Sequence, residues 1–313
     1  MCPKLGKERA LLDVAGHVLS FSLYEGLVFG FVAIGVYLTF RVLGFPDLTV
    51  DGSFALGGAV AAVFIASGVN PFLATLAAFG AGLCAGLVTS LLNTKLRIPA
   101  LLAGILVMVA LYSINLRVMG GAYVSLLREV TIFDLTSQFL GLETRIAYSL
   151  LVAGVLAVIV FFILNWFLRT EIGLALRATG DNEQMVRGFG VNTDMTTILG
   201  VSISNGLVAF GGAVVAQRQG FADVGMGIGI IVMGLASVII GEALFRPKGV
   251  ARLLLAALGG AFIYRLVISV ALRLGMAPGD LKLITAVLVI IALAVPYLQK
   301  RVQREWLPPA ARW

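Results

Sequence analysis

Charge is scarce in this sequence. Asp, Glu, Lys and Arg make up 12% of its 313 residues, against about 25% in a typical soluble domain, whereas 60% are hydrophobic. The mean hydropathy is +1.03. This composition excludes an ordinary soluble fold and predicts an all-α integral membrane protein, with one transmembrane domain over 1–313.

Several catalytic and nucleotide-binding patterns are also missing. The two cysteines, Cys2 and Cys84, offer no disulfide framework, and the one histidine, His17, lies outside the main apolar runs. No Gly-x-x-x-x-Gly-Lys-Ser/Thr sequence occurs, so we expect no P-loop for ATP. No His-Glu-x-x-His, Cys-His or Ser-Lys set lies at one depth, so an intramembrane enzyme is the least favoured class. We assign no catalytic residue and no metal ligand.

What the sequence has instead is a series of long apolar runs. A helix needs about 20 residues to cross about 30 Å of hydrocarbon. The runs predict about nine transmembrane helices, which begin near Leu19, Gly52, Pro71, Ile98, Ile146, Thr193, Gly225, Gly249 and Leu281.

Lys and Arg gather in alternate loops between these runs, and basic loops are retained on the cytoplasmic side of a membrane. The segment 119–145 is more acidic and is predicted to lie outside. The residues predicted inside are Lys95, Arg97, Arg169, Arg177, Arg187, Arg246, Lys248, Arg252, Lys300, Arg301 and Arg304. The spans then place the C-terminus in the cytoplasm and the N-terminus outside, although Lys4, Lys7 and Arg9 alone would favour the reverse.

One stretch of the sequence occurs twice. Gly44-Phe45-Pro46-Asp47 returns as Gly220-Phe221-Ala222-Asp223, a shift of 176 residues that also superposes Gly30 on Gly206 and Gly35 on Gly211. Five predicted spans separate corresponding points, so we expect the second copy to be inverted relative to the first. The predicted repeats cover about 19–118 and 193–298. Paired interruptions in two halves of a membrane chain indicate a transport pathway between them.

Each copy of this motif is predicted to interrupt a helix near the membrane midplane. Pro46 cannot continue a helix, and the neighbouring glycines relax the backbone, so 45–52 is predicted to be non-helical. Asp51 or Ser53 would cap the next span and leave free amide groups that attract an anionic group. The alternative is that Asp47 and Asp51 only cap a turn. If so, Asp47→Ala would lower stability as much as transport, whereas a role in transport predicts the larger loss in transport.

Arg265 lies in the middle of a predicted span, where an unpaired charge is costly. We expect it to face Glu25, Glu242 or water. Other charged residues near span ends, among them Arg41 and Arg218, are expected to reach water or to pair.

The longest polar interval on the predicted cytoplasmic side is 169–192. Asp181 or Asn182 would cap a short helix through Met185 and Val186, which would end at Gly188 or Gly190. A short helix across the cytoplasmic face is a docking element for a partner protein.

Two motifs together resemble those of a known family. Arg177-Ala178-x-Gly180-x-Asn182, followed by Gly190-Val191-Asn192, is similar to the ATPase-contacting loop of ABC importer permeases related to branched-chain amino-acid permeases. The nine residues from Phe45 to Ser53 resemble the early signature of the tryptophan/tyrosine-type subgroup. The resemblance runs from about Leu19 to Tyr297. Val186 stands where many relatives carry a smaller Ala.

The resemblance implies a dimer of permease chains, two ATPase subunits and an extracytoplasmic binding protein, in a bacterial inner membrane. ATP and Mg would be bound by the ATPase, and neither a cofactor nor a nucleic-acid partner is expected here. The implied coupling residues are Arg177, Gly180, Asp181, Asn182, Glu183 and Gly190. The implied path residues are Phe45, Asp47, Asp51, Ser53, Phe221 and Asp223.

The expected substrate is a small polar solute. The subgroup suggests an amino acid, an aromatic one by its label, although selectivity in such systems often rests with the binding protein. The alternative class is an ion-coupled secondary transporter, in which Asp47, Asp51 or Asp223 would carry a cation. Such a carrier needs no docking loop, and dependence on a separate ATPase separates the two classes.

Overall fold

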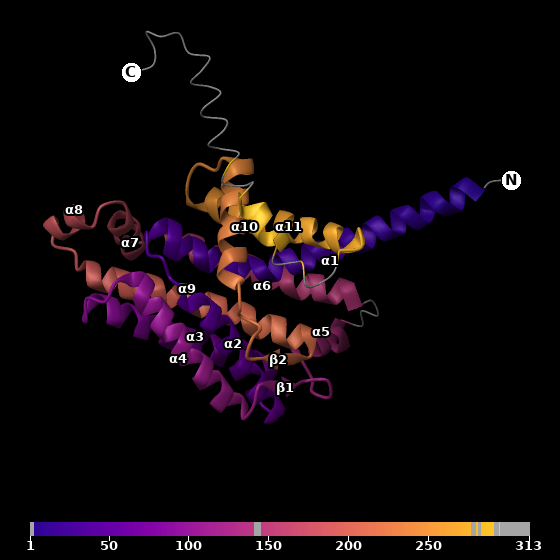
Figure 1. Cartoon of the computed structure of the whole chain (residues 1–313), viewed down its shortest axis with the longest axis horizontal. Helices are drawn as coiled ribbons and strands as arrows, with labels where there is room; N and C mark the ends of the chain where they lie inside the picture. Colours follow the sequence, from indigo (N-terminus) through magenta and orange to yellow (C-terminus); the bar gives the residue numbers. More distant parts are fainter. Residues whose placement is uncertain (1–2, 141–144, 277–279, 281–282, 291–293, 295–313) are drawn as a thin grey trace, which may run out of the picture.

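The computed structural model describes residues 3–140, 145–276, 280, 283–290 and 294. Helices dominate it, with one short β ribbon (Figure 1). The first half contains α1 (Pro3–Val36), the π-helical η1 (Tyr37–Val42), α2 (Thr49–Ala66), α3 (Pro71–Thr94), α4 (Ala100–Met119), β1 (Tyr123–Ser125) and α5 (Ile132–Leu140). It continues with α6 (Arg145–Phe167), α7 (Glu171–Asp181), α8 (Glu183–Gly188), α9 (Thr193–Gln219), β2 (Phe221–Asp223), α10 (Ile230–Phe245) and α11 (Val250–Arg273).

The chain is an all-helical membrane protein. Seven of the described helices are long and apolar enough to cross a bilayer: α1 with η1, α2, α3, α4, α6, α9 and α11. α10 is apolar but has 16 residues, or about 24 Å of helix, which is short of the hydrocarbon thickness. The predicted nine spans therefore become seven or eight in the part of the chain that the structure describes. Of the ninth run, from Leu281, the structure describes only 283–290 and 294.

α9 is the central helix, and α1, α2 and α3 all pack against it. α11 packs against α1 and α10. α1 and α9 run in opposite directions, because Leu43 just after η1 lies against Gly200 near the start of α9. At the other end, the Arg218 guanidinium lies 5.3 Å from the centre of the Tyr24 ring.

The two ends of the bundle differ, and Figure 1 shows α7 and α8 at one end and the β ribbon with α5 at the other. At the α7/α8 end, Lys95 Nζ lies 3.3 Å from Asp194 Oδ2. At the ribbon end, β1 and β2 pair in antiparallel register with Tyr123 opposite Asp223. Basic residues predicted to share one side, including Lys95 and Arg187, thus lie at one end.

α2 and α9 cross with their backbones almost touching. A Cβ atom on Gly57 would collide with the carbonyl oxygen of Ala209, and one on Gly212 would collide with that of Phe54. Small residues at such crossings allow the close approach that supplies packing energy between membrane helices. Gly80 on the neighbouring α3 has no atom within 4 Å of its Cβ position.

We expect Gly57→Val to destabilise the protein by about 3 kcal/mol or more, because backbone atoms on α9 cannot move aside. Gly80→Val is the matched control and should change stability by less than about 1 kcal/mol, because valine has the better helix propensity and meets no atom among the described residues. Thermal unfolding of the detergent-solubilised chain, followed by size-exclusion chromatography, measures both. Equal losses for the two variants would show that the crossing is not tight.

Candidate functional site

The first interruption lies between η1 and α2, at residues 43–48. It is shorter than predicted, because α2 already begins at Thr49. The reason is Asp47, whose Oδ1 accepts a hydrogen bond from the Thr49 amide at 2.9 Å. A carboxylate that accepts from a backbone amide two residues on supports a tight turn, and so allows the helix to start early.

Asp47 is buried, with 2% of its surface exposed. Its Oδ2 accepts from Asn205 Nδ2 of α9 at 2.6 Å. Asn205 Oδ1 in turn accepts from the Ser53 hydroxyl at 2.7 Å. Asp47 and Ser53, both predicted path residues, are thus joined through one asparagine on the central helix. Their polar atoms are satisfied by protein partners, as buried polar groups require.

Asn205 was not among the predicted site residues. A polar amide in the middle of an apolar span is expensive and is a functional candidate by default. That signal was present in the sequence, but the long-range partner 158 residues away was not.

Asp51 corrects the capping prediction. Neither Asp51 nor Ser53 caps α2, whose N-cap residue is Leu48 and makes no side-chain cap hydrogen bond. Asp51 instead accepts from the backbone amides of Gly229 at 2.9 Å and Ile231 at 2.8 Å, at the start of α10. One amide at the start of α2, that of Thr49, is therefore occupied by Asp47, and two at the start of α10 are occupied by Asp51.

The second interruption, from Gly220 to Gly229, contains β2 and is pinned to the loop after α4. Val224 donates its amide to the Ala122 carbonyl at 3.0 Å. Phe221 and Asp223 are half-buried. The Phe221 ring lies 5.5 Å from that of Tyr123, and Asp223 Oδ1 accepts from the Gly225 amide at 2.7 Å. A break was predicted here, but its strand pairing was not.

A cavity of about 340 Å³ lies where α2, α4 and the second interruption meet. Its walls include Met108, Val109 and Ile228, together with Asp51 and Asn115. Asp51 is the predicted path residue that lines this cavity. The second interruption contributes to it directly, and Asp51 on α2 also holds the start of α10.

A second cavity, of about 350 Å³, lies at the α7/α8 end and is lined by Phe45, Pro46 and Arg187. Arg187 donates to Glu183 Oε1 at 2.7 Å and to Thr193 Oγ1 at 2.6 Å. Arg187 therefore ties α8 to the start of α9. Residues of α7 and α8 and residues of the first interruption thus share the wall of this cavity.

The predicted short helix is present as α8, and Asn182 caps it by accepting from the Met185 amide at 3.0 Å. Gly190 follows it in the left-handed region, at φ 84°. A second helix, α7, precedes it and was not predicted, although Thr170 Oγ1 caps its start by accepting from Gly173. The loop is thus a helical pair.

The predicted coupling residues face in different directions. Gly180 faces inward, where a Cβ atom would collide with the Val42 carbonyl oxygen. Arg177 is half-buried, whereas Asp181, Asn182 and Gly190 are exposed. Sequence reasoning missed two exposed apolar side chains. Met185 on α8 is 50% exposed, and Phe189 at the C-cap of α8 is 79% exposed.

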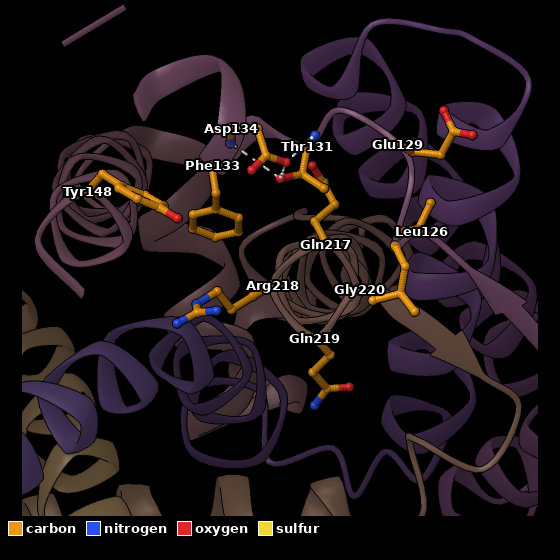
Figure 2. Close-up of a pocket in the computed structure, with 11 residues that line it drawn as sticks. Leu126, Glu129, Thr131, Phe133, Asp134, Tyr148, Gln217, Arg218, Gln219 and Gly220 are labelled. Atoms are coloured by element: carbon orange, nitrogen blue, oxygen red, sulfur yellow. Dashed lines mark hydrogen bonds between the residues drawn. The ribbon is translucent and has the colours of Figure 1, made fainter. Parts of the chain in front are cut away.

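A smaller cavity of about 130 Å³ lies at the ribbon end, between α5, α6 and the end of α9. Figure 2 shows Gln217 pointing toward Asp134 and Thr131, while Gln219 points the other way. Gln217 Oε1 accepts from the Ile132 amide at 3.1 Å, and Asp134 Oδ2 accepts from the Thr131 hydroxyl at 2.7 Å. These polar groups bond to one another, and the bond between Ile132 and Gln217 joins the start of α5 to the end of α9.

Two ion pairs join α1 and η1 to the last described helices. Arg265 pairs with Glu25 at 3.1 Å, which confirms one of the two predicted partners. Its guanidinium lies 3.4 Å from the centre of the Phe29 ring. Arg41 pairs with Glu242 at 2.9 Å.

A family model described as the permease component of branched-chain amino acid transport systems matches residues 18–294. The chain belongs to this family. It is the permease of an ATP-binding-cassette importer, a transport subunit that is not itself catalytic, as its two motifs indicated.

Similar proteins agree with this family assignment. The tyrosine transport system permease protein of Clostridioides difficile (strain R20291) is 42% identical over 270 residues, which cover 86% of this chain and 88% of that protein. An uncharacterised protein of Rickettsia prowazekii (strain Madrid E) is 34% identical over 282 residues, 89% and 97% of the two chains. The solved structure of PsaBC from Streptococcus pneumoniae in complex with Fab shares the fold, with a TM-score of 0.54 at 15% identity over 88% of this chain and 91% of that one.

Proposed function

We propose that the permease imports an amino acid, with an aromatic one as the first candidate. A separate extracytoplasmic protein would deliver the substrate, and a pair of ATPase subunits would bind two permease chains from the cytoplasm. The observation that carries this proposal is α8, a capped helix at one end of the bundle with exposed apolar side chains. The 42% identity to a tyrosine transport permease supports the substrate class.

The α7/α8 end suits ATPase docking because it is both exposed and tied to the transmembrane core. Phe189 offers an apolar anchor to a partner, and interface energy concentrates in such anchors. Gly180 lies against the backbone of Val42, next to the first interruption. Movement of the helical pair would therefore be transmitted directly to residues 43–48.

Helix contacts support the inverted repeat. Gly35 lies against Ser204 and Val208, and Gly211 lies against Val28 and Val32. Adding 176 to positions 35, 28 and 32 gives 211, 204 and 208, so both crossings join the same pairs of repeat positions. Because α1 and α9 run in opposite directions, the operation that relates them inverts the chain across the membrane.

A second pair of contacts follows the same rule. Gly82 of α3 lies against Gly206 of α9, and Gly30 of α1 lies against Leu258 of α11. Position 30 plus 176 is 206, and 82 plus 176 is 258. The repeat would thus place the two interruptions on opposite sides of the midplane, as in transporters with discontinuous helices.

The path would run between the interruptions and be enclosed by two permease chains. With the basic loops on the inner side of the membrane, the α7/α8 end and the C-terminus would face the cytoplasm of a bacterial cell. The N-terminus and the β ribbon face outside, where the binding protein would dock. The ion-coupled alternative is less well supported, because the chain belongs to a family of ATP-binding-cassette importer permeases.

The test is ATP hydrolysis by the permease co-expressed with the ATPase from its operon, reconstituted with the matching binding protein and a panel of amino acids. We expect a stable complex whose hydrolysis rises with one loaded binding protein. Uptake driven by a proton or sodium gradient in the absence of any ATPase would contradict the proposal.

A further inference from the structure

The cavity between α2, α4 and the second interruption has an acidic group but no basic one in its wall. Among the residues that the structure describes, its lining contains no Lys, Arg or His. Apolar side chains, including Met108, Val109 and Ile228, form most of the wall. The polar groups are the Asp51 carboxylate, the Asn115 amide and two hydroxyls, those of Tyr112 and Ser113. Small-molecule sites are typically apolar cavities with a few convergent polar groups.

Asn115 has an unused acceptor. Its Nδ2 donates to the Gly52 carbonyl at 3.3 Å, and because a carbonyl only accepts, this bond fixes which way the amide is turned. Oδ1 is buried and has no hydrogen-bond partner among the described residues, and Asn115 as a whole is 1% exposed. A buried acceptor without a partner is unfavourable until a donor arrives.

Asp51 adds a carboxylate group to the same cavity. Its two oxygens accept from Gly229 and Ile231, but a carboxylate has about four acceptor positions, so it can accept further hydrogen bonds. The two backbone amides at the start of α10 are occupied by Asp51. The cavity therefore favours a cationic donor, and it offers a substrate carboxylate no cation, only the Tyr112 and Ser113 hydroxyls.

We propose that this cavity is a recognition site for hydrophobic amino acids within the permease. It takes the α-ammonium group at Asp51 and Asn115, and it packs the side chain against Met108, Val109 and Ile228. The volume of about 340 Å³ lies within the range of small-ligand sites. The proposal rests on the proposed function. It adds a site that binds the ammonium group and the side chain of the substrate but has no charged partner for the carboxylate.

The test is protection of a cysteine in the cavity wall. Ile228 is 65% exposed, so Ile228→Cys, in a background with Cys2→Ser and Cys84→Ser, places a reactive thiol there without burying it. The permease–ATPase complex, without binding protein, is labelled with a maleimide in the presence of L-tyrosine, tyrosinamide or N-acetyltyrosine. We expect the first two to slow labelling at least twofold and the third, which lacks the ammonium group, to have no effect.

Variants on α4 separate recognition from folding. Asn115→Leu should abolish protection, and Asn115→Asp should retain it, because Asp also accepts from an ammonium group. Val109→Trp should fill the cavity and block protection, whereas Leu106→Trp, an exposed α4 residue outside the cavity, should leave it intact.

Equal protection by all three compounds, or by none, overturns the proposed site, provided that the wild-type complex hydrolyses ATP in response to loaded binding protein. Absence of that response would instead count against the proposed function. The two failures are therefore distinguishable.

Discussion

Asp47→Asn alone is expected to destabilise the permease by about 2 kcal/mol and to lower transport in proportion. The substitution keeps an acceptor for the Thr49 amide. However, it replaces Asp47 Oδ2 with an amide group that donates. In the unsubstituted chain, Asn205 Nδ2 donates to that oxygen at 2.6 Å. Two donors then face each other in a buried position, and hydrogen bonds to charged groups contribute about 1.5–3 kcal/mol.

Combining Asp47→Asn with Asn205→Asp should restore part of that stability. The carboxylate then lies on α9, accepts from the new amide at position 47 and still accepts from the Ser53 hydroxyl. Both long-range hydrogen bonds are kept, the one between positions 47 and 205 with donor and acceptor exchanged, whereas the local bond from Asn205 Nδ2 to the Val201 carbonyl is lost. Ser53→Ala, which removes one hydrogen bond from the same cluster, is the matched control and should cost about 1 kcal/mol.

The double variant also decides what Asp47 does in transport. Melting temperature and ATP-driven uptake are measured on the same preparations. Recovery of both would assign Asp47 to the turn and to the α2–α9 contact. Recovery of stability without uptake would show that the negative charge must lie at position 47 itself. Failure of the double variant to regain stability would contradict the geometry of the cluster.

The sequence predicted local features well. Asn182 caps α8 as expected, because capping depends on residues within one turn. The apolar runs gave the spans, since crossing hydrocarbon requires a continuous apolar helix. Glu25, which pairs with Arg265, was one of the two residues predicted to face it, water being the third possibility. Such a prediction is possible because a cation within the membrane has few anions to pair with.

The features that were missed depend on long-range pairing. Asp51 was predicted to cap its own helix, but it holds the start of α10, 178 residues further on. Asn205 carried no local motif, yet it joins Asp47 to Ser53. The start of α2 was placed too late because the hydrogen bond from Thr49 to Asp47 was not anticipated. These contacts follow from how helices cross, which local patterns do not specify.

Phe189→Asp is expected to weaken binding of the ATPase at least about 30-fold, with the fold of the permease unchanged. Phe189 is 79% exposed and ends α8. An apolar anchor at an interface contributes about 2 kcal/mol or more, and each 1.4 kcal/mol corresponds to a factor of ten in affinity. Because the side chain makes few contacts within the chain, its replacement costs little stability.

Leu127→Asp is the matched control for this variant. Leu127 is also 79% exposed, but it lies at the ribbon end, next to Gly220. Co-purification of the ATPase and ATP hydrolysis by the complex should fall for Phe189→Asp and stay near wild type for Leu127→Asp, with similar melting temperatures for both. Glu183→Arg is less informative, because it removes the acceptor of the Thr193 hydroxyl, which joins α8 to the start of α9. Equal co-purification of the ATPase with both variants would show that the ATPase does not dock on the exposed side of α8.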